Sequence, residues 1–228
     1  RTNSQEDPKV WKHVYEEGKF TAIFQFTAEG ARKFCLNAKP TDIETLGALT
    51  AIYRPGPLKA NVHQKFVKAK KNAANIIYDH PVIKEVLGPT FNFVIFQEQF
   101  MLLAQKLAGF TPGESDKLRK TLVKKSLDTL DGKADERELA KQKFVKGAKE
   151  LHNIDEEITV ALWETIEAFS VYGFNKSHAI AYAIDSYYSA WLHTYYEEEW
   201  LGTVLQSCLL YTSPSPRDQR GSRLPACA

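Results

Sequence analysis

Apolar side chains recur at helical spacing along most of the chain. The windows 28–36, 60–71 and 80–88 place hydrophobic residues three or four positions apart, which is the period of one helix face. In the third window Pro81 lies near the start and Gly88 at the end, and both positions are typical of helix boundaries. These three windows are therefore predicted to be helices.

The second half of the chain continues the helical pattern in longer segments. One helix is expected to begin near Asp135 and another near Asp155. A last helix is expected to run from about Ser177 to Gln206, because no proline interrupts that stretch. Strand signals are few, so the sequence predicts a mainly α fold with at most a few short strands.

Two segments depart from this pattern. Residues 91–96 form the one apolar, β-prone run, but helix formers follow directly, so a strand and a helix beginning near Asn92 both remain open. Residues 53–58, with the sequence YRPGPL, are expected to form a turn. The reason is that two prolines fix φ there, while the glycine between them supplies conformational freedom.

The clearest helix start lies at residues 111–114, Thr-Pro-Gly-Glu, which form a capping box. The helix is expected to run to about Lys125, with Leu118 and Leu122 facing a core. Its other side gathers five cations, namely Lys117, Arg119, Lys120, Lys124 and Lys125. Such a cationic face either meets an anion such as a phosphate chain or is simply solvated, and this segment alone favours neither.

Composition changes this picture through the distribution of charge. The 228 residues, 43% of them hydrophobic, suffice for one large domain or two small ones with a buried core. Lys and Arg number 30 against 28 Asp and Glu, which by itself suggests no polyanionic partner. Residues 54–149, however, hold 19 basic and 10 acidic side chains, whereas residues 150–207 hold 1 and 10. The charge is thus segregated along the chain.

The only cation of the acidic segment lies in the sequence YGFNKSHAIAYA, residues 172–183. Lys176 is flanked there by Asn175, Ser177 and His178, at the expected start of the last helix. Helix N-termini offer unpaired N–H groups and a partial positive charge, so these residues are candidates for anion binding. The alternative, which the segment taken alone favours, is that Asn175 or Ser177 only caps the helix while His178 packs.

Two further sets of residues are candidates for contact with a ligand. Arg54 is presented by the YRPGPL turn, where it has little entropy to lose, and such a guanidinium suits phosphate or carboxylate recognition; it could equally close a loop. Gln97 and Gln99 flank Glu98 at the edge of an apolar segment. Their expected role is structural, the satisfaction of backbone or partner groups, and contact with a nucleotide or template is the alternative.

Several classes of protein are excluded by what the sequence lacks. It contains no GxxxxGK[ST], GxGxxG, HExxH or GxSxG motif, which removes P-loop, Rossmann, zincin and hydrolase-elbow assignments. No D-x-D pair is present to hold two metals from one strand, and no apolar run approaches the roughly 18 residues of a membrane span. Cys35 is alone in the body of the chain, so neither a disulfide nor a cysteine zinc site is expected, and a cytoplasmic setting fits.

Both ends of the sequence are unusual. The first residue is Arg1 and no signal peptide follows, so the chain is expected to be an internal fragment of a longer protein. From Cys208 the helical pattern gives way to the aperiodic, Pro-rich text CLLYTSPSPRDQRGSRLPACA. Its beginning resembles the translation of a sequencing-library adapter. Residues 208–228 are therefore predicted to be a non-native or disordered tail that packs against nothing.

Five segments together resemble the α subunit of bacterial DNA polymerase III, a replicative C-family DNA polymerase. They occur in the order and near the spacing typical of that family, over roughly residues 20–207. The segments are IFQF (23–26), ALTAIYRPGPL (48–58), IFQEQFM (95–101), LAGFTPGESDKLRKTLVKK (107–125) and FSVYGFNKSHAIAYA (169–183).

The resemblance implies a fold, a division of the chain and an activity. Residues 1–50 would be the end of the palm and the entry to the fingers, and residues 51–207 the helical fingers domain. The family catalyses template-directed addition of deoxynucleotides to a primer 3′ end. The metal-binding aspartates, which hold Mg²⁺, would lie outside this chain, so the fragment alone is expected to be inactive. Implied partners are the DNA template-primer, deoxynucleoside triphosphates, the sliding clamp and other replicase subunits, with no membrane.

The resemblance also implies roles for particular residues. Nucleotide or phosphate binding falls on Arg54, Arg119, Lys120, Lys124, Lys125, Asn175, Lys176, Ser177 and His178, and contact with the template or nascent pair on Gln97 and Gln99. Lys120 replaces a usual Arg, Val123 a usual Gly and Phe96 a usual Tyr. The competing hypothesis is a non-catalytic helical nucleic-acid-binding module, but such a module needs neither a rigid YRPGP turn nor a lone lysine in an acidic segment.

Overall fold

The computed structural model describes residues 7–123, 133–170 and 172–212. Over these ranges the chain is built of helices, and no strand occurs; the one β-type pairing is an isolated parallel bridge between Phe96 and Phe174. The predicted mainly α fold is confirmed. No helix in the same ranges combines the length and the apolar character needed to cross a membrane.

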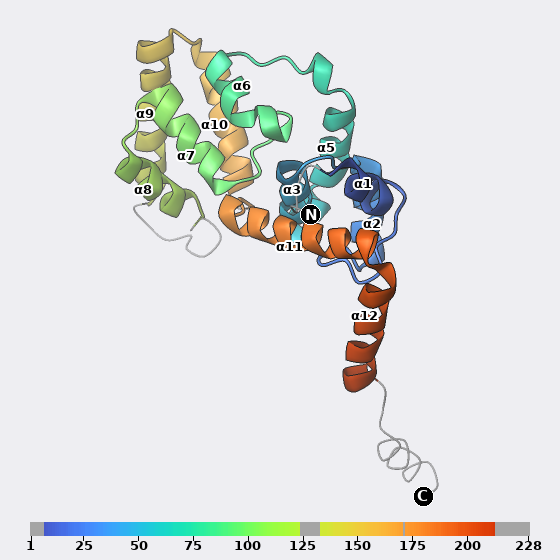
Figure 1. Cartoon of the computed structure of the whole chain (residues 1–228). Helices are drawn as coiled ribbons and strands as arrows, with labels where there is room; N and C mark the ends of the chain where they lie inside the picture. Colours follow the sequence, from blue (N-terminus) through green and yellow to red (C-terminus); the bar gives the residue numbers. More distant parts are fainter. Residues whose placement is uncertain (1–6, 124–132, 171, 213–228) are drawn as a thin grey trace, which may run out of the picture.

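The helices form two lobes, each around its own hydrophobic core (Figure 1). The terminal lobe combines both ends of the chain, and the central lobe lies between them in sequence. The terminal lobe contains α1 (Pro8–Val10) with its π-helical continuation (Trp11–Glu16), α2 (Glu29–Ala38), α3 (Ile43–Ile52), α4 (Pro55–Lys59), α5 (Val62–Lys71) and α11 (Lys176–Tyr195). The central lobe contains α6 (Pro81–Leu87), α7 (Gln97–Ala108), α8 (Pro112–Val123), α9 (Lys133–His152) and α10 (Glu156–Ser170).

The terminal lobe is organised by α3, which packs along α11. Seven of the ten residues of α3 are buried, so the helix is apolar around most of its circumference and shows no amphipathic period. For that reason the spacing of apolar residues did not predict it. Gly47 permits the close approach, because a Cβ there would lie 3.1 Å from the Ile180 side chain. The Asp42 carboxylate caps α3 by accepting from the Thr45 amide at 2.7 Å.

The central lobe is a compact set of helices around α7, which packs against α6, α8 and α9. Its core contains Phe100, Phe144 and Trp163, all nearly inaccessible to solvent. Helices α7 and α9 approach so closely that a Cβ on Gly147 would lie 2.2 Å from the Ala108 carbonyl oxygen. Phe169 at the end of α10 contacts the cores of both lobes and so joins them.

The predicted helices near residues 28–36, 60–71 and 80–88 are confirmed as α2, α5 and α6. The helices expected near Asp135 and Asp155 are α9 and α10. The capping box is also confirmed: the Thr111 amide donates to Glu114 Oε2 at 2.9 Å, and the Glu114 amide donates to Thr111 Oγ1 at 3.3 Å.

Three local predictions were wrong. The last helix is interrupted at Tyr196, and a separate helix α12 (Glu197–Thr212) extends away from the terminal lobe (Figure 1). Three glutamates in its first turn favour a new helix start, because they complement the partial positive charge of the N-terminus. The helix continues past Ser207 to Thr212, so the helical structure does not end where its pattern does. Residues 213–228, the rest of the predicted tail, lie outside the described residues.

The other two errors concern short segments. Residues 55–58 of the YRPGPL stretch belong to the five-residue helix α4 rather than to a turn, with Pro55 in its first position. Proline suits that position, since its missing N–H would be unpaired there in any case. Gly56 is required for another reason than freedom of φ: a Cβ there would lie 2.4 Å from the Tyr172 ring. Residues 91–96 are neither a regular strand nor a helix, and α7 begins only at Gln97.

Candidate functional site

The two lobes meet at residues 172–175, which connect α10 to α11; we call this segment the junction turn. The Phe174 amide donates to the Ile95 carbonyl at 3.0 Å, and the Gln97 amide donates to the Phe174 carbonyl at 2.9 Å. These two bonds make the isolated bridge that joins the turn to the start of α7. All the candidate residues that the structure describes lie on or close to this junction, or on α8 beside it.

Arg54 reaches the junction turn from the terminal lobe. It is the N-terminal cap of α4, held extended by the proline after it. Its Nε donates to the Ala51 carbonyl at 2.6 Å and its NH2 to the Tyr172 carbonyl at 2.7 Å, while the guanidinium lies 4.5 Å from the centre of the Phe174 ring. Partial burial lowers the pKa of Arg54. No carboxylate among the described residues pairs with it.

Arg119 approaches the same turn from the central lobe through Gln97. The Gln97 Nε2 donates to the Gly173 carbonyl at 3.1 Å, and its Oε1 accepts from Arg119 NH1 at 3.5 Å. The Arg119 guanidinium also donates from Nε and NH2 to Asp116 Oδ1 at 3.0 and 2.9 Å. Asp116 holds Lys120 as well, with 2.7 Å between Lys120 Nζ and Asp116 Oδ2. Hydrogen bonds from Lys120 and Arg119 accordingly lower the pKa of Asp116.

The start of α11 is fixed by two side-chain acceptors. Asn175 is the N-terminal cap, and its Oδ1 accepts from the His178 amide at 2.8 Å and from Ser177 Oγ at 2.7 Å. Glu98 supplies the second acceptor: Oε1 accepts from Asn175 Nδ2 at 2.9 Å and Oε2 from the Lys176 amide at 2.8 Å. This carboxylate at a helix N-terminus is favourable both by charge and by hydrogen bonding.

Two glutamates at the junction could not be assigned these roles from the sequence. Glu98 is separated by 77 residues from Asn175, and Glu44, which pairs with Lys176 at 2.7 Å, by 132 residues from its partner. The Lys176 ammonium thus turns toward a small cavity of about 140 Å³ lined by Glu44, Glu85 and Lys106, among others. Sequence spacing carries no signal for contacts of this range, since the signal extends over only a few helix turns.

Gln99 has a different environment from Gln97. It is 5% exposed, its Oε1 accepts from the amides of Ile95 and Phe96, and its Nε2 donates to Val86 O and Thr90 Oγ1. The amide is therefore engaged in fixing the residues before α7. This geometry matches the structural role expected for it, and its contact with a template stays a prediction.

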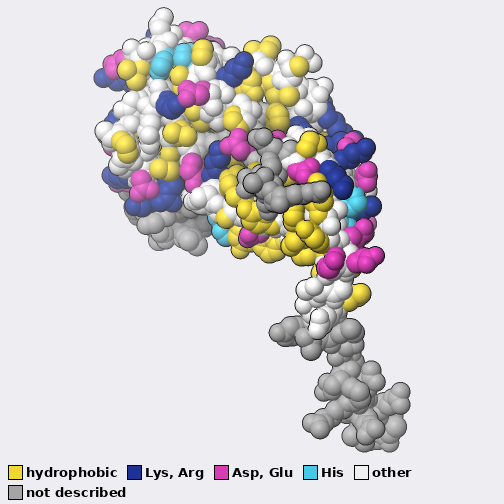
Figure 2. Space-filling model, in the orientation of Figure 1, with side chains coloured by type: hydrophobic (Ala, Val, Ile, Leu, Met, Phe, Trp, Pro, Cys, Tyr) yellow, Lys and Arg dark blue, Asp and Glu magenta, His cyan; other side chains and the backbone are white. Residues whose placement is uncertain are grey.

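The exposed cations of α8 are met by carboxylates of the same lobe. Lys117 lies 3.5 Å from Glu136 and Lys120 lies 2.7 Å from Asp116, while Glu114 of α8 pairs with Lys143 of α9. Hydrogen bonds from Lys143 and Thr111 lower the pKa of Glu114 to about 2. Figure 2 accordingly shows basic and acidic side chains interspersed over the central lobe. The cationic face is thus partly neutralised without an external anion. Lys124 and Lys125 lie outside the described residues.

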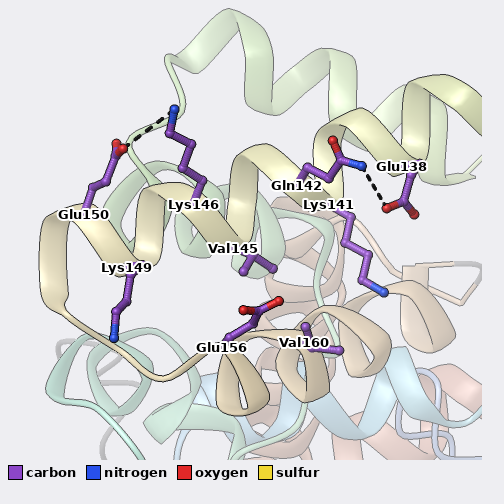
Figure 3. Close-up of a pocket in the computed structure, with 9 residues that line it drawn as sticks. All are labelled: Glu138, Lys141, Gln142, Val145, Lys146, Lys149, Glu150, Glu156 and Val160. Carbon is purple, nitrogen blue, oxygen red and sulfur yellow. Dashed lines mark hydrogen bonds and ion pairs between the residues drawn. The ribbon is translucent and has the colours of Figure 1, made fainter.

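The structure therefore brings Arg54, Arg119 and the start of α11 together, but it pairs Arg119 and the start of α11 with carboxylates. A cavity of about 660 Å³ lies elsewhere, between α9 and α10 (Figure 3). Three lysines and three glutamates line it, and Lys146 pairs with Glu150 at 3.8 Å. In the described part of the chain no group of three His, Cys, Asp or Glu side chains is placed to hold a metal ion.

Comparison with known proteins gives consistent results. The family profile described as "Bacterial DNA polymerase III alpha subunit finger domain" matches residues 1–152. The chain is 40% identical over 200 residues to the DNA polymerase III subunit alpha of Aquifex aeolicus, covering 88% of this chain and 16% of that protein. It is 41% identical over 189 residues to the same subunit of Borreliella burgdorferi, and the match covers 83% of this chain and 16% of that protein. It is 36% identical over 207 residues to the DNA polymerase III subunit alpha of Vibrio cholerae, and the match covers 88% of this chain and 17% of that protein. The chain thus spans about a sixth of the length of these relatives.

Proposed function

The chain belongs to the finger-domain family of the bacterial DNA polymerase III alpha subunit, and from that premise we propose that it binds the incoming deoxynucleoside triphosphate and the template-primer. It does so as part of a larger replicative DNA polymerase that extends a primer 3′ end. Residues 1–50 would lead from the palm into fingers formed by residues 51–207. The catalytic carboxylates with their Mg²⁺ would be supplied from outside this chain, as would contacts with the sliding clamp and other replicase subunits in the cytoplasm.

The observation that carries the proposal is the environment of the Arg54 guanidinium. Its guanidinium is partly buried, fixed by two backbone carbonyls and one ring, and unpaired with any carboxylate of the described residues. A fixed guanidinium loses little entropy on binding and matches the oxygens of a phosphate. Because partial burial lowers the pKa of Arg54, a bound anion would stabilise its charged form. A phosphate of the nucleotide or of the template-primer supplies the missing negative charge.

The remaining site residues would act around Arg54. Arg119 and Lys120 share Asp116, and a triphosphate, which carries more charge than one carboxylate, would compete for both cations. Lys124 and Lys125 would extend that cationic face. At the start of α11, Asn175, Lys176, Ser177 and His178 would contribute an amide, an ammonium, a hydroxyl and a ring. Gln97 connects the two groups, since it contacts both Arg119 and the junction turn, and it would lie beside the nascent pair.

The test compares Arg54→Ala with Arg32→Ala in the purified chain. Arg32 is a matched control because it too is half-exposed and donates from Nε to a backbone carbonyl, that of Phe26 at 3.3 Å. Binding of a fluorescent primer-template and of a fluorescent deoxynucleoside triphosphate is measured at low salt. We expect Arg54→Ala to weaken one or both about tenfold, the value of a lost charge-assisted hydrogen bond, and Arg32→Ala to change neither.

Equal effects of the two substitutions would leave only non-specific attraction to phosphate and would favour the nucleic-acid-binding module. The purified chain is also expected to show no primer extension with Mg²⁺, because two-metal phosphoryl transfer needs a convergent carboxylate set. Primer extension abolished by mutation of one of the chain's own carboxylates would overturn the placement of the catalytic residues outside it.

A further inference from the structure

A continuous series of planar groups in contact, two ring pairs tilted and the last one stacked, leads from Arg54 to Phe24; we call it the ring ladder. Arg54 lies over Phe174, and the Phe174 and His178 ring centres are 5.4 Å apart. The His178 and Tyr182 centres are 4.2 Å apart, and Tyr182 stacks on Phe24 with a centroid distance of 5.2 Å and an interplanar angle of 25°. The ladder joins the junction turn to the IFQF segment, whose role the site described above left open.

The IFQF segment is built to present Phe24 outward. Its neighbours Ile23 and Phe26 are buried at 0% and 1% exposure, whereas Phe24 is 39% exposed. Gln25 adopts the left-handed conformation with φ of 66°, which is unfavourable for a residue with a side chain. From α12, Trp200 Nε1 donates to the Thr21 carbonyl at 3.2 Å and so holds the loop in place. A fixed loop thus keeps a large apolar ring at the surface.

The exposed rings match the chemistry of a nucleobase. Bases stack on aromatic side chains without requiring a particular sequence, because every base has a π-face. Two members of the ladder, Phe24 and His178, are exposed, and Figure 2 shows hydrophobic side chains gathered over this part of the terminal lobe. At the other end Arg54, which pairs with no carboxylate of the described residues, adds charge complementarity to a phosphate backbone. A single-stranded nucleotide offers both a base and a phosphate to such a surface.

We propose that the ring ladder is a base-stacking subsite, in which Phe24 stacks on an unpaired nucleobase of the DNA whose phosphates Arg54 contacts. This inference rests on the proposed function and deepens it. The same stacking chemistry could serve an unpaired template base or the base of the incoming nucleotide. The structure favours the template strand, because two exposed rings of one ladder suit two successive bases, whereas the incoming nucleotide has only one.

The experiment uses the whole chain with three substitutions. Phe24→Ala removes the ring and Phe24→Trp keeps a stacking surface. Tyr188→Ala is the matched control, because Tyr188 is 41% exposed on α11, close to the value for Phe24, and makes none of the ladder's ring contacts. The probes are a primer-template with 2-aminopurine in its single-stranded overhang, whose fluorescence falls on stacking, and a fluorescent deoxynucleoside triphosphate. Circular dichroism establishes that each variant is folded.

We expect Phe24→Ala to weaken binding of the overhang about tenfold and to abolish the quenching of 2-aminopurine. Phe24→Trp should retain both, and Tyr188→Ala should change neither. Loss of nucleotide binding alone in Phe24→Ala would overturn the assignment to the template strand. If Phe24→Ala binds both probes like the unchanged chain while Arg54→Ala does not, the subsite is wrong and the proposed function stands. If the unchanged chain binds neither probe, both proposals fail.

Discussion

The two lobes are built from the sequence in opposite ways. The central lobe takes its core from one continuous stretch, residues 83–166, in which successive helices pack against each other. The terminal lobe combines residues 10–66 and 95–96 with residues 179–190, so its core is complete only when α11 returns from the far side of the central lobe. The candidate site lies at this point of return. The candidate site therefore depends on contacts between segments that lie far apart in the sequence.

Hydrogen bonds also connect α11 to the rest of the terminal lobe. In the terminal lobe the buried Tyr15 and Ser186 hydroxyls are hydrogen-bonded at 3.0 Å, and Tyr195 donates to Asp7 at 2.7 Å. Burial raises the pKa of Tyr15 well above its usual value, because the phenolate would be poorly solvated there. The central lobe buries polar side chains as well, among them Gln99, Ser115 and Thr159. Hydrogen bonds across the terminal core fix the orientation of α11 and hence of the residues at its start.

The largest expected effect comes from separating the lobes. A segment spanning residues 78–170 should fold by itself and melt cooperatively, since its core residues are local in sequence. Residues 1–75 should not, because they lack Ala179, Ala183, Tyr187 and Ala190, which form one side of the terminal core. Circular dichroism melts of both segments test this. A cooperative melt of residues 1–75 without α11 would remove the difference between the lobes.

A single methyl group should disrupt the central lobe. In Gly147→Ala the new Cβ would meet the Ala108 carbonyl oxygen at 2.2 Å, and backbone cannot move aside as a side chain can. Overpacking of this kind costs about 3 kcal/mol of unfolding free energy. Gly113→Ala is the control, because nothing lies within 4 Å of a Cβ there. Urea titrations should show equal or higher stability for the control, as Ala is the better helix former.

The junction between the lobes should respond to Glu98. Glu98→Ala removes the two carboxylate oxygens that accept from Asn175 Nδ2 and from the Lys176 amide at the start of α11. We expect a loss of about 1–2 kcal/mol in unfolding free energy. Glu29→Ala provides a control that removes an exposed carboxylate paired only with Lys33 on the same helix. Equal loss in the two variants would mean that Glu98 does not connect the lobes.

The smallest effect concerns pH and the N-terminal cap of α6. His80 Nδ1 accepts from the Val82 amide at 3.2 Å, which requires a neutral ring. Burial and the nearby His152 lower the pKa of His80 in the folded state. The unfolded chain therefore binds the proton first, so stability is complete above about pH 7 and falls as the pH drops through about 6.5.

Asn at this position caps a helix but does not titrate. In His80→Asn the dependence of the melting temperature on pH between 7 and 5.5 should be shallower than in the unchanged chain. Some dependence should persist, because burial also lowers the pKa of His13. An unaltered slope would show that the His80 cap does not contribute to the pH response.

A feature could be predicted from the sequence when the residues that form it lie close together in the chain. The capping box at residues 111–114 was predictable because its two hydrogen bonds join residues three positions apart. The buried helix α3 was not, since it has no polar face to give a period. The helix α4 was mistaken for a turn because prolines and glycine occur in both, and only the Tyr172 ring over Gly56 shows why glycine is needed. The sequence indicated the candidate cations, but it did not indicate Asp116 as the partner of Arg119 and Lys120 or Glu44 as the partner of Lys176.

The sequence alone determined the helical class, most helix positions, the segregation of charge and the residues that carry the family resemblance. These properties depend on spacing, composition and local hydrogen bonds, which are written in consecutive residues. Only the tertiary structure decided that Arg54 has no carboxylate partner among the described residues, that Glu98 caps α11, and that Phe24 continues a ladder of rings from Phe174. Those contacts join residues far apart in the chain, and packing of the two lobes, which no local pattern encodes, brings them within reach of one another.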